Sequence, residues 1–238
     1  MPTLKIGFYN CNGLSHFKWE YVMRSFENDV FDIIFLAETW FVGEDYHRAH
    51  PYYVFSSKID GSTRDNGRCK NGLMCLAKPF IKSQISNIES TTHTLNLCVY
   101  GHNIFAVYFP PSLEIGKIKD YVLNRGFSIM LGDLNTYFGS NFGQKRNFPI
   151  NRIELFNDLV DKLDMKHVRP ATDMDIPDHA FIDFDLTASW DKFISVDSNP
   201  SDHLLMVLNV DISSTPLIEH FISAEKINLS NINDPSCK

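Results

Sequence analysis

The sequence predicts an α/β fold in which stacked mixed β-sheets carry α-helices on their outer faces. Two observations predict it. Short apolar segments alternate with helical stripes of apolar residues along most of the chain. Some of these segments are joined by a hairpin turn and others are separated by a helix, so both antiparallel and parallel strand pairs are expected. This mixture favours packed sheets with outer helices over a simple parallel α/β fold.

The first part of the chain contains four strand candidates and one helix. A strand at residues 4–9 ends at Asn10, and residues 33–37 form a fully apolar run, typical of a strand covered on both faces. Residues 52–57 and 72–78 are further strand candidates on either side of a polar loop. The helix between the first two strands has an apolar face with i, i+3, i+4, i+7 spacing, made of Trp19, Val22, Met23 and Phe26.

The rest of the domain contains a hairpin, two helices and three more strands. Residues 94–100 and 104–109 flank Gly101 to Asn103, which is a good hairpin signal. A short helix is expected at 113–124, ahead of a strand at 129–131. Asn151 and Glu154 resemble a capping box. They introduce a helical stripe made of Ile153, Phe156, Leu159, Val160 and Leu163, and strands at 180–186 and 204–210 close the domain.

Composition places the chain among ordinary globular proteins. It has 238 residues, of which 44% are hydrophobic and 21% charged. No apolar run approaches the length of a membrane span, and the first residues lack a signal-peptide pattern. Five cysteines without metal-type spacing suit free thiols in a reducing compartment. We expect one domain at residues 1–212 and a linker or tail at 213–238, where Ser, Asn and Pro accumulate and periodicity fades.

Polar or acidic residues recur where the apolar segments end. They are Asn10 and Asn12, Glu38, Tyr108, Asp133 and Asn135, Asp183, and the Ser201–Asp202–His203 triplet before the last strand. Taken singly, each has an ordinary interpretation as a turn, surface or core residue. Together they indicate a site, because rigid strand ends are where a scaffold displays chemistry.

The ordered motifs NCNGL, LAETW, VYFPP, LGDLN, IDFDL and SDH resemble those of the endonuclease/exonuclease/phosphatase superfamily. The pairing of AETW with VYFPPS and GDLN is most similar to the apurinic-type endonuclease domain of non-LTR retrotransposons. The resemblance covers roughly residues 4–210. It implies a four-layered α/β sandwich of two mixed sheets with outer helices, as in DNase I-like proteins, with the motif loops meeting at one edge.

The resemblance also implies a role for each motif residue. Glu38 would be the metal ligand with Asn10 beside it, and Asp202 would lie near a second metal position. Asp133 would orient or deprotonate the attacking water, and Asp183 would hold the ring of His203. Asn135 and Tyr108 would donate hydrogen bonds to phosphate oxygens, and Asn10 and Asn12 would also contact substrate. The metal would be Mg²⁺, with Mn²⁺ as the alternative, since oxygen ligands suit hard cations.

These residue types match what phosphodiester cleavage requires. The reaction needs an activated water, stabilisation of charge on phosphorus and help for the leaving oxygen. A protonated imidazole beside a carboxylate and neutral amide and phenol donors supply preorganised hydrogen bonds. Three departures from the apurinic endonuclease pattern, at Phe181, Ala180 and Pro111, put abasic-site recognition in doubt and point away from the repair enzymes.

The leading functional hypothesis is a Mg²⁺-dependent endonuclease that nicks double-stranded DNA and leaves a 3′ hydroxyl to prime reverse transcription. It would act in the nucleus, without a membrane partner, and be fused to a reverse transcriptase. The alternatives are an inositol phosphate or sphingomyelin type phosphatase or phosphodiesterase, an apurinic repair endonuclease, and a catalytically dead binding scaffold. With a net charge of −7, few cations are available for DNA, and Lys145 and Arg146 beyond the GDLN motif are the best candidates.

Overall fold

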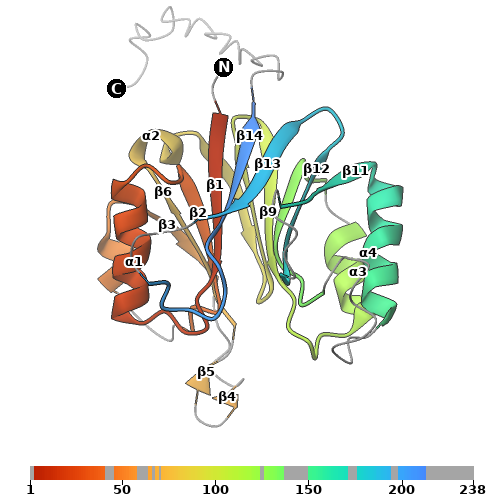
Figure 1. The fold of residues 1–238 in the computed structure, drawn as a ribbon, viewed down its shortest axis with the longest axis horizontal. Helices are drawn as coiled ribbons and strands as arrows, with labels where there is room; N and C mark the ends of the chain where they lie inside the picture. The colour runs from red at the N-terminus through yellow and green to blue at the C-terminus, as the bar shows by residue number, and fades with distance from the viewer. Residues whose placement is uncertain are drawn as a thin grey trace, which may run out of the picture.

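A computed structural model describes residues 3–40, 46–57, 64–65, 68–69, 71–123, 126–136, 150–170, 176–193 and 198–212. Two mixed six-stranded sheets pack face to face, and helices cover their outer sides (Figure 1). This arrangement confirms the four-layered DNase I-like sandwich expected from the sequence. In the part of the chain that the structure describes, no helix is long and apolar enough to cross a membrane.

The first sheet has the order β13-β14-β1-β2-β6-β3. β1 pairs in parallel with β2, and the other neighbours are antiparallel. The helix α1 (His16–Glu27) lies on its outer side (Figure 1). The strands are β1 (Thr3–Asn10), β2 (Ile33–Ala37), β3 (Tyr53–Ser56), β6 (Leu73–Ala77), β13 (Thr187–Lys192) and β14 (Met206–Asp211).

The second sheet has the order β11-β12-β10-β9-β8-β7, with β9 and β10 parallel. The helices α3 (Ile115–Leu123) and α4 (Ile150–Leu163) lie on its outer side (Figure 1). The strands are β7 (Ile85–Ser90), β8 (Thr94–Val99), β9 (His102–Tyr108), β10 (Ile129–Asp133), β11 (Met165–Val168) and β12 (Asp178–Asp183). The remaining elements are η1 (Tyr46–Ala49), α2 (Pro79–Lys82) and the two-residue strands β4 (Arg64–Asp65) and β5 (Arg68–Cys69).

Alternation along the central strands explains the layers. Successive side chains of a strand point to opposite faces, so one strand feeds two cores. In β2, Phe35 packs between the sheets while Leu36 packs beneath α1. In β9, Ala106 packs between the sheets while Phe105 packs beneath α3 and α4. The fully apolar runs of the sequence are therefore strands buried on both faces.

The predictions of individual strands, turns and caps were confirmed in part. The fully apolar run at 33–37 is β2, as expected. The hairpin forms, but its turn is Tyr100–Gly101, both at positive φ, because β9 already begins at His102. The capping box is wrong, since α4 starts at Ile150 and Asn151 therefore lies inside the helix. The strands β7, β11 and β13 were not predicted, and they are largely polar in sequence.

Strand direction decides which residues share an edge. The strands β1 and β2 run parallel, as do β9 and β10, and their carboxyl ends lie at the lower edge in Figure 1. The strands β12 and β14 are antiparallel to this set, so their first residues lie at that same edge. The site is therefore assembled from the ends of four strands and the beginnings of two.

Candidate active site

Asn10 lies at the centre of the lower edge, where β1 ends. Its buried side-chain nitrogen donates to Glu38 Oε1 at 2.9 Å and to Asp133 Oδ2 at 2.9 Å. Its side-chain oxygen accepts from the main-chain N–H of Asn12 at 2.9 Å. Asn10 thus links the two sheets through one amide, and the atom that faces Glu38 is a hydrogen-bond donor and not a ligand oxygen.

Glu38 follows β2 and is half-buried at the edge. Its Oε2 accepts from the indole Nε1 of Trp40 at 3.3 Å. Trp40 also explains why residue 13 is a glycine. A Cβ atom at this position would lie 2.5 Å from the indole ring, and the φ angle of Gly13 is +86°. Glu38 has a φ of 49°, which is unusual for a residue with a side chain. The surrounding loop therefore holds this carboxylate in a conformation that is costly for the backbone.

Asp133 ends β10 and is almost completely buried. Its Oδ1 accepts from the main-chain N–H of Asn135 at 2.8 Å, in addition to the bond from Asn10. Burial raises the pKa of Asp133, and the charge of Asp178 raises it further, to about 7, although His203 and these hydrogen bonds act in the opposite direction. A carboxyl whose pKa lies near neutrality is suited to accept a proton during a reaction.

His203 contacts two acids from its place just before β14. Its Nδ1 lies 3.3 Å from Asp178 Oδ2, and its Nε2 lies 3.9 Å from Asp133 Oδ2. Burial lowers the pKa of His203, but the hydrogen bond that its ring donates to Asp178 and the charges of Asp178, Asp133 and Asp202 outweigh that effect and raise the pKa to about 9. The imidazole is therefore protonated at neutral pH.

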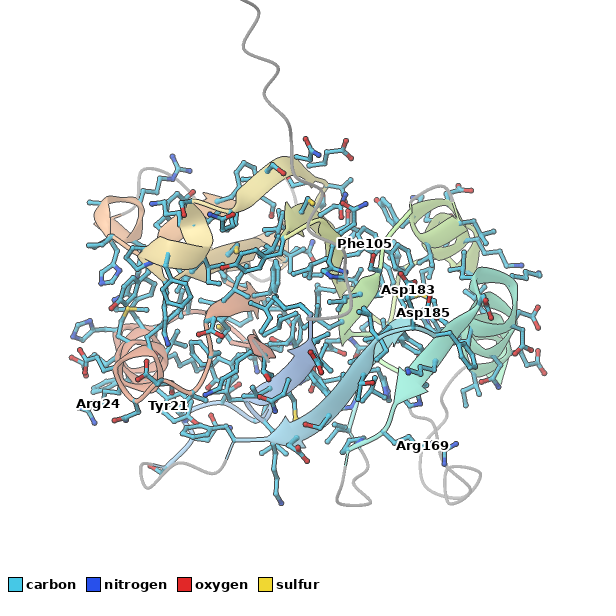
Figure 2. All side chains as sticks on the ribbon, turned by 90° about the horizontal axis from the view of Figure 1, so that it is seen from above. Tyr21, Arg24, Phe105, Arg169, Asp183 and Asp185 are labelled. Carbon is cyan, nitrogen blue, oxygen red and sulfur yellow. The ribbon has the colours of Figure 1, made fainter. Side chains whose placement is uncertain are left out.

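The predicted pairing of Asp183 with His203 is wrong. Because β12 is antiparallel to β10, Asp178 pairs with Asp133, whereas Asp183 lies beyond Ile182, the partner of Ile129 at the start of β10. Figure 2, viewed from above, labels Asp183 and Asp185, which lie at the end of β12 away from the site. The sequence contains one signal for Asp178, since Pro177 and Asp178 stand directly before a short apolar run, as the other predicted site residues stand at the ends of theirs.

The loop before β14 is fastened to the first sheet. Asn199 accepts from the Tyr9 hydroxyl at 2.7 Å and donates to the main-chain carbonyl of His203. Ser201 donates through its hydroxyl to the main-chain carbonyl of Asn10 at 2.9 Å. These bonds fix the position of the imidazole, and sequence reasoning missed Asn199 because it lies outside the SDH motif.

The other expected contact residues also lie at this edge. Asp202 accepts from the side chain of Asn12 at 3.2 Å, and this hydrogen bond lowers its pKa despite the opposing effect of partial burial. Tyr108 is buried at the end of β9, where it pairs with Asp133, and burial followed by the charge of Glu38 raises its pKa. The phenol is therefore a neutral hydrogen-bond donor.

Asn135 points back to the segment after β9. Its Nδ2 donates to the main-chain carbonyl of Phe109 at 3.2 Å, and its φ is 46°. The amide nitrogen carries two hydrogens, and this bond uses one of them. Lys145 and Arg146 lie outside the described residues.

The donor set of the edge fits a divalent cation. Ligand atoms of Asp133, Asp178 and His203 lie within 4.8 Å of one another, and Asn10 links the carboxylate of Asp133 to that of Glu38. Because the imidazole is protonated, the ligands that this edge offers to a cation are its carboxylate oxygens. Within the described residues, the buried Oδ1 of Asp178 has no hydrogen-bond partner. Hard cations such as Mg²⁺ prefer oxygen ligands of this kind.

Comparison with known proteins shows a likeness in structure. The sequence matches no model of a known protein family and no curated protein. A 3′ phosphatase, NExo, from Neisseria bound to a product DNA hairpin is 14% identical, with 87% of this chain and 99% of that one covered and a TM-score of 0.64. An AP endonuclease from Archaeoglobus fulgidus is 12% identical, with 88% and 100% covered and a TM-score of 0.62.

The endonuclease domain of TRAS1, a telomere-specific non-LTR retrotransposon, is 15% identical, with 88% of this chain and 99% of that one covered and a TM-score of 0.60. The chain has the DNase I-like fold that these solved structures share. The resemblance drawn from the motifs is thereby confirmed at the level of fold. Within this fold, the described motif residues other than Asp183 converge on one edge of the sandwich.

Proposed function

We propose that this chain is a divalent-metal-dependent phosphodiester hydrolase that nicks double-stranded DNA. The observation that carries the proposal is the contact of His203 with Asp178 and Asp133 beside the Asn10–Glu38 pair. It combines a charged imidazole, a carboxyl with a pKa near neutrality and a half-buried carboxylate at one edge. Nucleases and a DNA-bound phosphatase among the structures with this fold support a phosphodiester or phosphomonoester substrate.

Each residue would act on a different part of the substrate. Asp133 would accept the proton of the attacking water, and the imidazolium of His203 would donate to a phosphate oxygen. Tyr108 and Asn135, both neutral, would donate hydrogen bonds to other phosphate oxygens as fixed dipoles. Asp178 would hold the ring of His203 and keep it protonated, which is the role first expected of Asp183.

Glu38 would hold the cation, with Asp202 as the next carboxylate along the edge. We expect Mg²⁺, and Mn²⁺ as an alternative, because the available ligands are carboxylate oxygens. When bound, such a cation supplies Lewis acidity and neutralises charge on the phosphate. Through its two donated hydrogen bonds, Asn10 would fix the position of the Glu38 carboxylate relative to that of Asp133.

The biological role we propose is the nicking step of retrotransposition. The nick would leave a 3′ hydroxyl that primes reverse transcription, and the domain would act in the nucleus as part of a protein that carries a reverse transcriptase. The support is the motif resemblance together with the likeness to the TRAS1 endonuclease domain. Lys145 and Arg146 remain the candidates for contact with the DNA backbone.

The test is incubation with supercoiled plasmid and Mg²⁺, followed by analysis of the ends. We expect nicked circles with 5′ phosphate and 3′ hydroxyl ends, lost in EDTA and in His203→Ala. Asp183→Asn is the matched control and should nick normally. Parallel substrates separate the alternatives: an abasic duplex, a 3′-phosphorylated duplex, an inositol polyphosphate and sphingomyelin. Turnover of one of these without any nicking of plasmid would overturn the proposal.

A further inference from the structure

Arg152 is a buried cation on α4 whose role the motifs do not explain. Its side chain is 2% exposed, although arginine is rarely buried without a partner. Within the described residues, the acceptors of its hydrogen bonds are all main-chain carbonyls. They are those of Phe109 at 3.2 Å, Leu134 at 3.1 Å, Pro110 at 2.6 Å, Pro111 at 3.3 Å and Leu113 at 2.9 Å.

These carbonyls belong to the two segments that carry the expected phosphate donors. Residues 109–113 follow Tyr108 directly, and Leu134 lies between Asp133 and Asn135. Arg152 and Asn135 share the carbonyl of Phe109 as an acceptor. A single guanidinium group therefore connects the segment after β9 to the segment after β10.

The sequence of the first segment favours such a donor, although the carbonyl of Pro110 also accepts from the main-chain N–H of Leu113 at 2.9 Å. Pro110 and Pro111 have no main-chain N–H, so this stretch offers few donors of its own while its carbonyls turn toward the interior. The planar guanidinium carries five N–H donors in a fixed fork, which suits several acceptors that lie close together. Lysine would retain the charge but not this geometry.

We propose that Arg152 is a positioning residue that aligns Tyr108 and Asn135 on one phosphate group. The inference rests on the proposed function, since it names a residue that supports the same site. By tying both segments to α4, Arg152 fixes the spacing between the phenol and the amide. It touches neither the substrate nor the reacting atoms, and acts through these two side chains.

The test compares Arg152→Met and Arg152→Lys with the control Leu155→Ala. Leu155 is buried on the same helix, in the core beneath α4, and its truncation destabilises the domain without removing a bond to either segment. The kcat and KM of each variant are measured from the nicking of supercoiled plasmid. The temperature is one at which circular dichroism shows that the variant is folded. Hydrogen exchange of peptides covering 108–114 and 133–136 is measured without substrate.

We expect Arg152→Met to lower kcat about 10²-fold with little change in KM, because misplacement by about 1 Å has that effect on rate. Arg152→Lys should recover part of the loss. Exchange should rise in both peptides for Arg152→Met and not for Leu155→Ala. In an Asn135→Ala background, Arg152→Met should cost less than in the wild type, since the two residues act through one contact.

The proposal is overturned if folded Arg152→Met retains the wild-type kcat, or if Leu155→Ala loses the same activity. Unchanged exchange in both peptides also overturns it. If the wild type cleaves none of the phosphate substrates, the proposed function fails, and the exchange data alone then decide whether Arg152 orders the two segments.

Discussion

The two ends of β12 each carry an aspartate, and the two differ in surroundings. Asp178 is 1% exposed, contacts His203 and leaves one buried oxygen without a described partner. Asp183 is half-buried at the opposite edge, where its main-chain N–H donates to the carbonyl of Ser128 at 2.9 Å. The same residue type, five positions along one strand, therefore belongs to a reactive site at one end and to ordinary sheet structure at the other.

The difference shows that strand direction decides which of the two acids lies at the candidate site. Parallel strands bring their carboxyl ends to one edge, whereas an antiparallel strand brings its first residue there. β12 is antiparallel to β10, so the acid before its apolar run meets the site and the acid within the run does not. Removing the two acids separately should separate their roles.

The largest expected effect is on catalysis at the site end. Asp178→Ala and His203→Ala should each lower the nicking rate by ~10²–10⁴, the typical contribution of a positioned acid or base. Asp183→Ala should leave the rate near that of the wild type, because its carboxyl lies at the opposite edge. Single-turnover nicking with circular dichroism as a folding check measures this. A comparable loss in Asp183→Ala would refute the assignment of the two ends.

The same comparison shows which site residues could be predicted from the sequence and which could not. Asn10, Glu38, Asp133 and His203 were predicted as one group because each stands where an apolar run stops, and the structure brings them together. Asp178 was missed because the direction of β12 depends on its pairing with β10, which is a long-range contact. The family motif was placed on Asp183 instead, at a position that the strand direction excludes.

Other features were beyond sequence reasoning for different physical reasons. Edge strand β13 (TASWDK) lacks the apolar alternation that identifies a half-buried strand. Arg152 lies on an amphipathic helix, where a charged residue is expected to be solvated, and it is buried against main-chain carbonyls of two other segments. Most strands and helices with a regular apolar pattern were predicted correctly, whereas features set by tertiary neighbours were not.

Metal dependence should follow the same division between the two ends. Glu38→Gln removes a carboxylate from the site edge and should raise the Mg²⁺ concentration needed for half-maximal nicking by roughly 10-fold or more. Asp185→Asn removes a carboxylate at the Asp183 end and serves as the matched control. A Mg²⁺ titration of each variant measures the shift. Equal Mg²⁺ requirements in all three proteins would remove Glu38 from the metal site.

The pH dependence of nicking should reflect the pKa values of His203 and Asp133. The proposed mechanism requires His203 protonated and Asp133 deprotonated, so the rate should fall as pH rises through about 9 and also as pH falls through about 7. The Asp178→Asn substitution removes the charge that contributes most to raising the pKa of His203. The alkaline limb of the rate profile should therefore move toward lower pH. The acid limb should also move down, because the charge of Asp178 helps to raise the pKa of Asp133.

Rate profiles from pH 5 to 10 in wild type, Asp178→Asn and Asp183→Asn measure these shifts. The Asp183→Asn profile should overlay that of the wild type, since neither limb depends on this carboxyl. An alkaline limb at the same pH in Asp178→Asn as in the wild type would show that Asp178 does not raise the pKa of His203.

The smallest expected effect concerns how an acidic chain holds DNA. Replacing both Lys145 and Arg146 by Ala should weaken binding and reduce the slope of log affinity against log salt by roughly 1–2 units, if each neutralises one phosphate. Lys166→Ala is the matched control, because Lys166 pairs with Ile182 near the Asp183 end and donates to the carbonyl of Phe184 at 3.0 Å. Titrations of a DNA duplex at several salt concentrations, in EDTA to prevent cleavage, compare the three proteins. Parallel lines of equal height for wild type and the double variant would exclude Lys145 and Arg146 from the DNA contact. A reduced slope in Lys166→Ala would instead mean that DNA reaches the opposite end of β12, and the contrast between the two ends would no longer hold for binding.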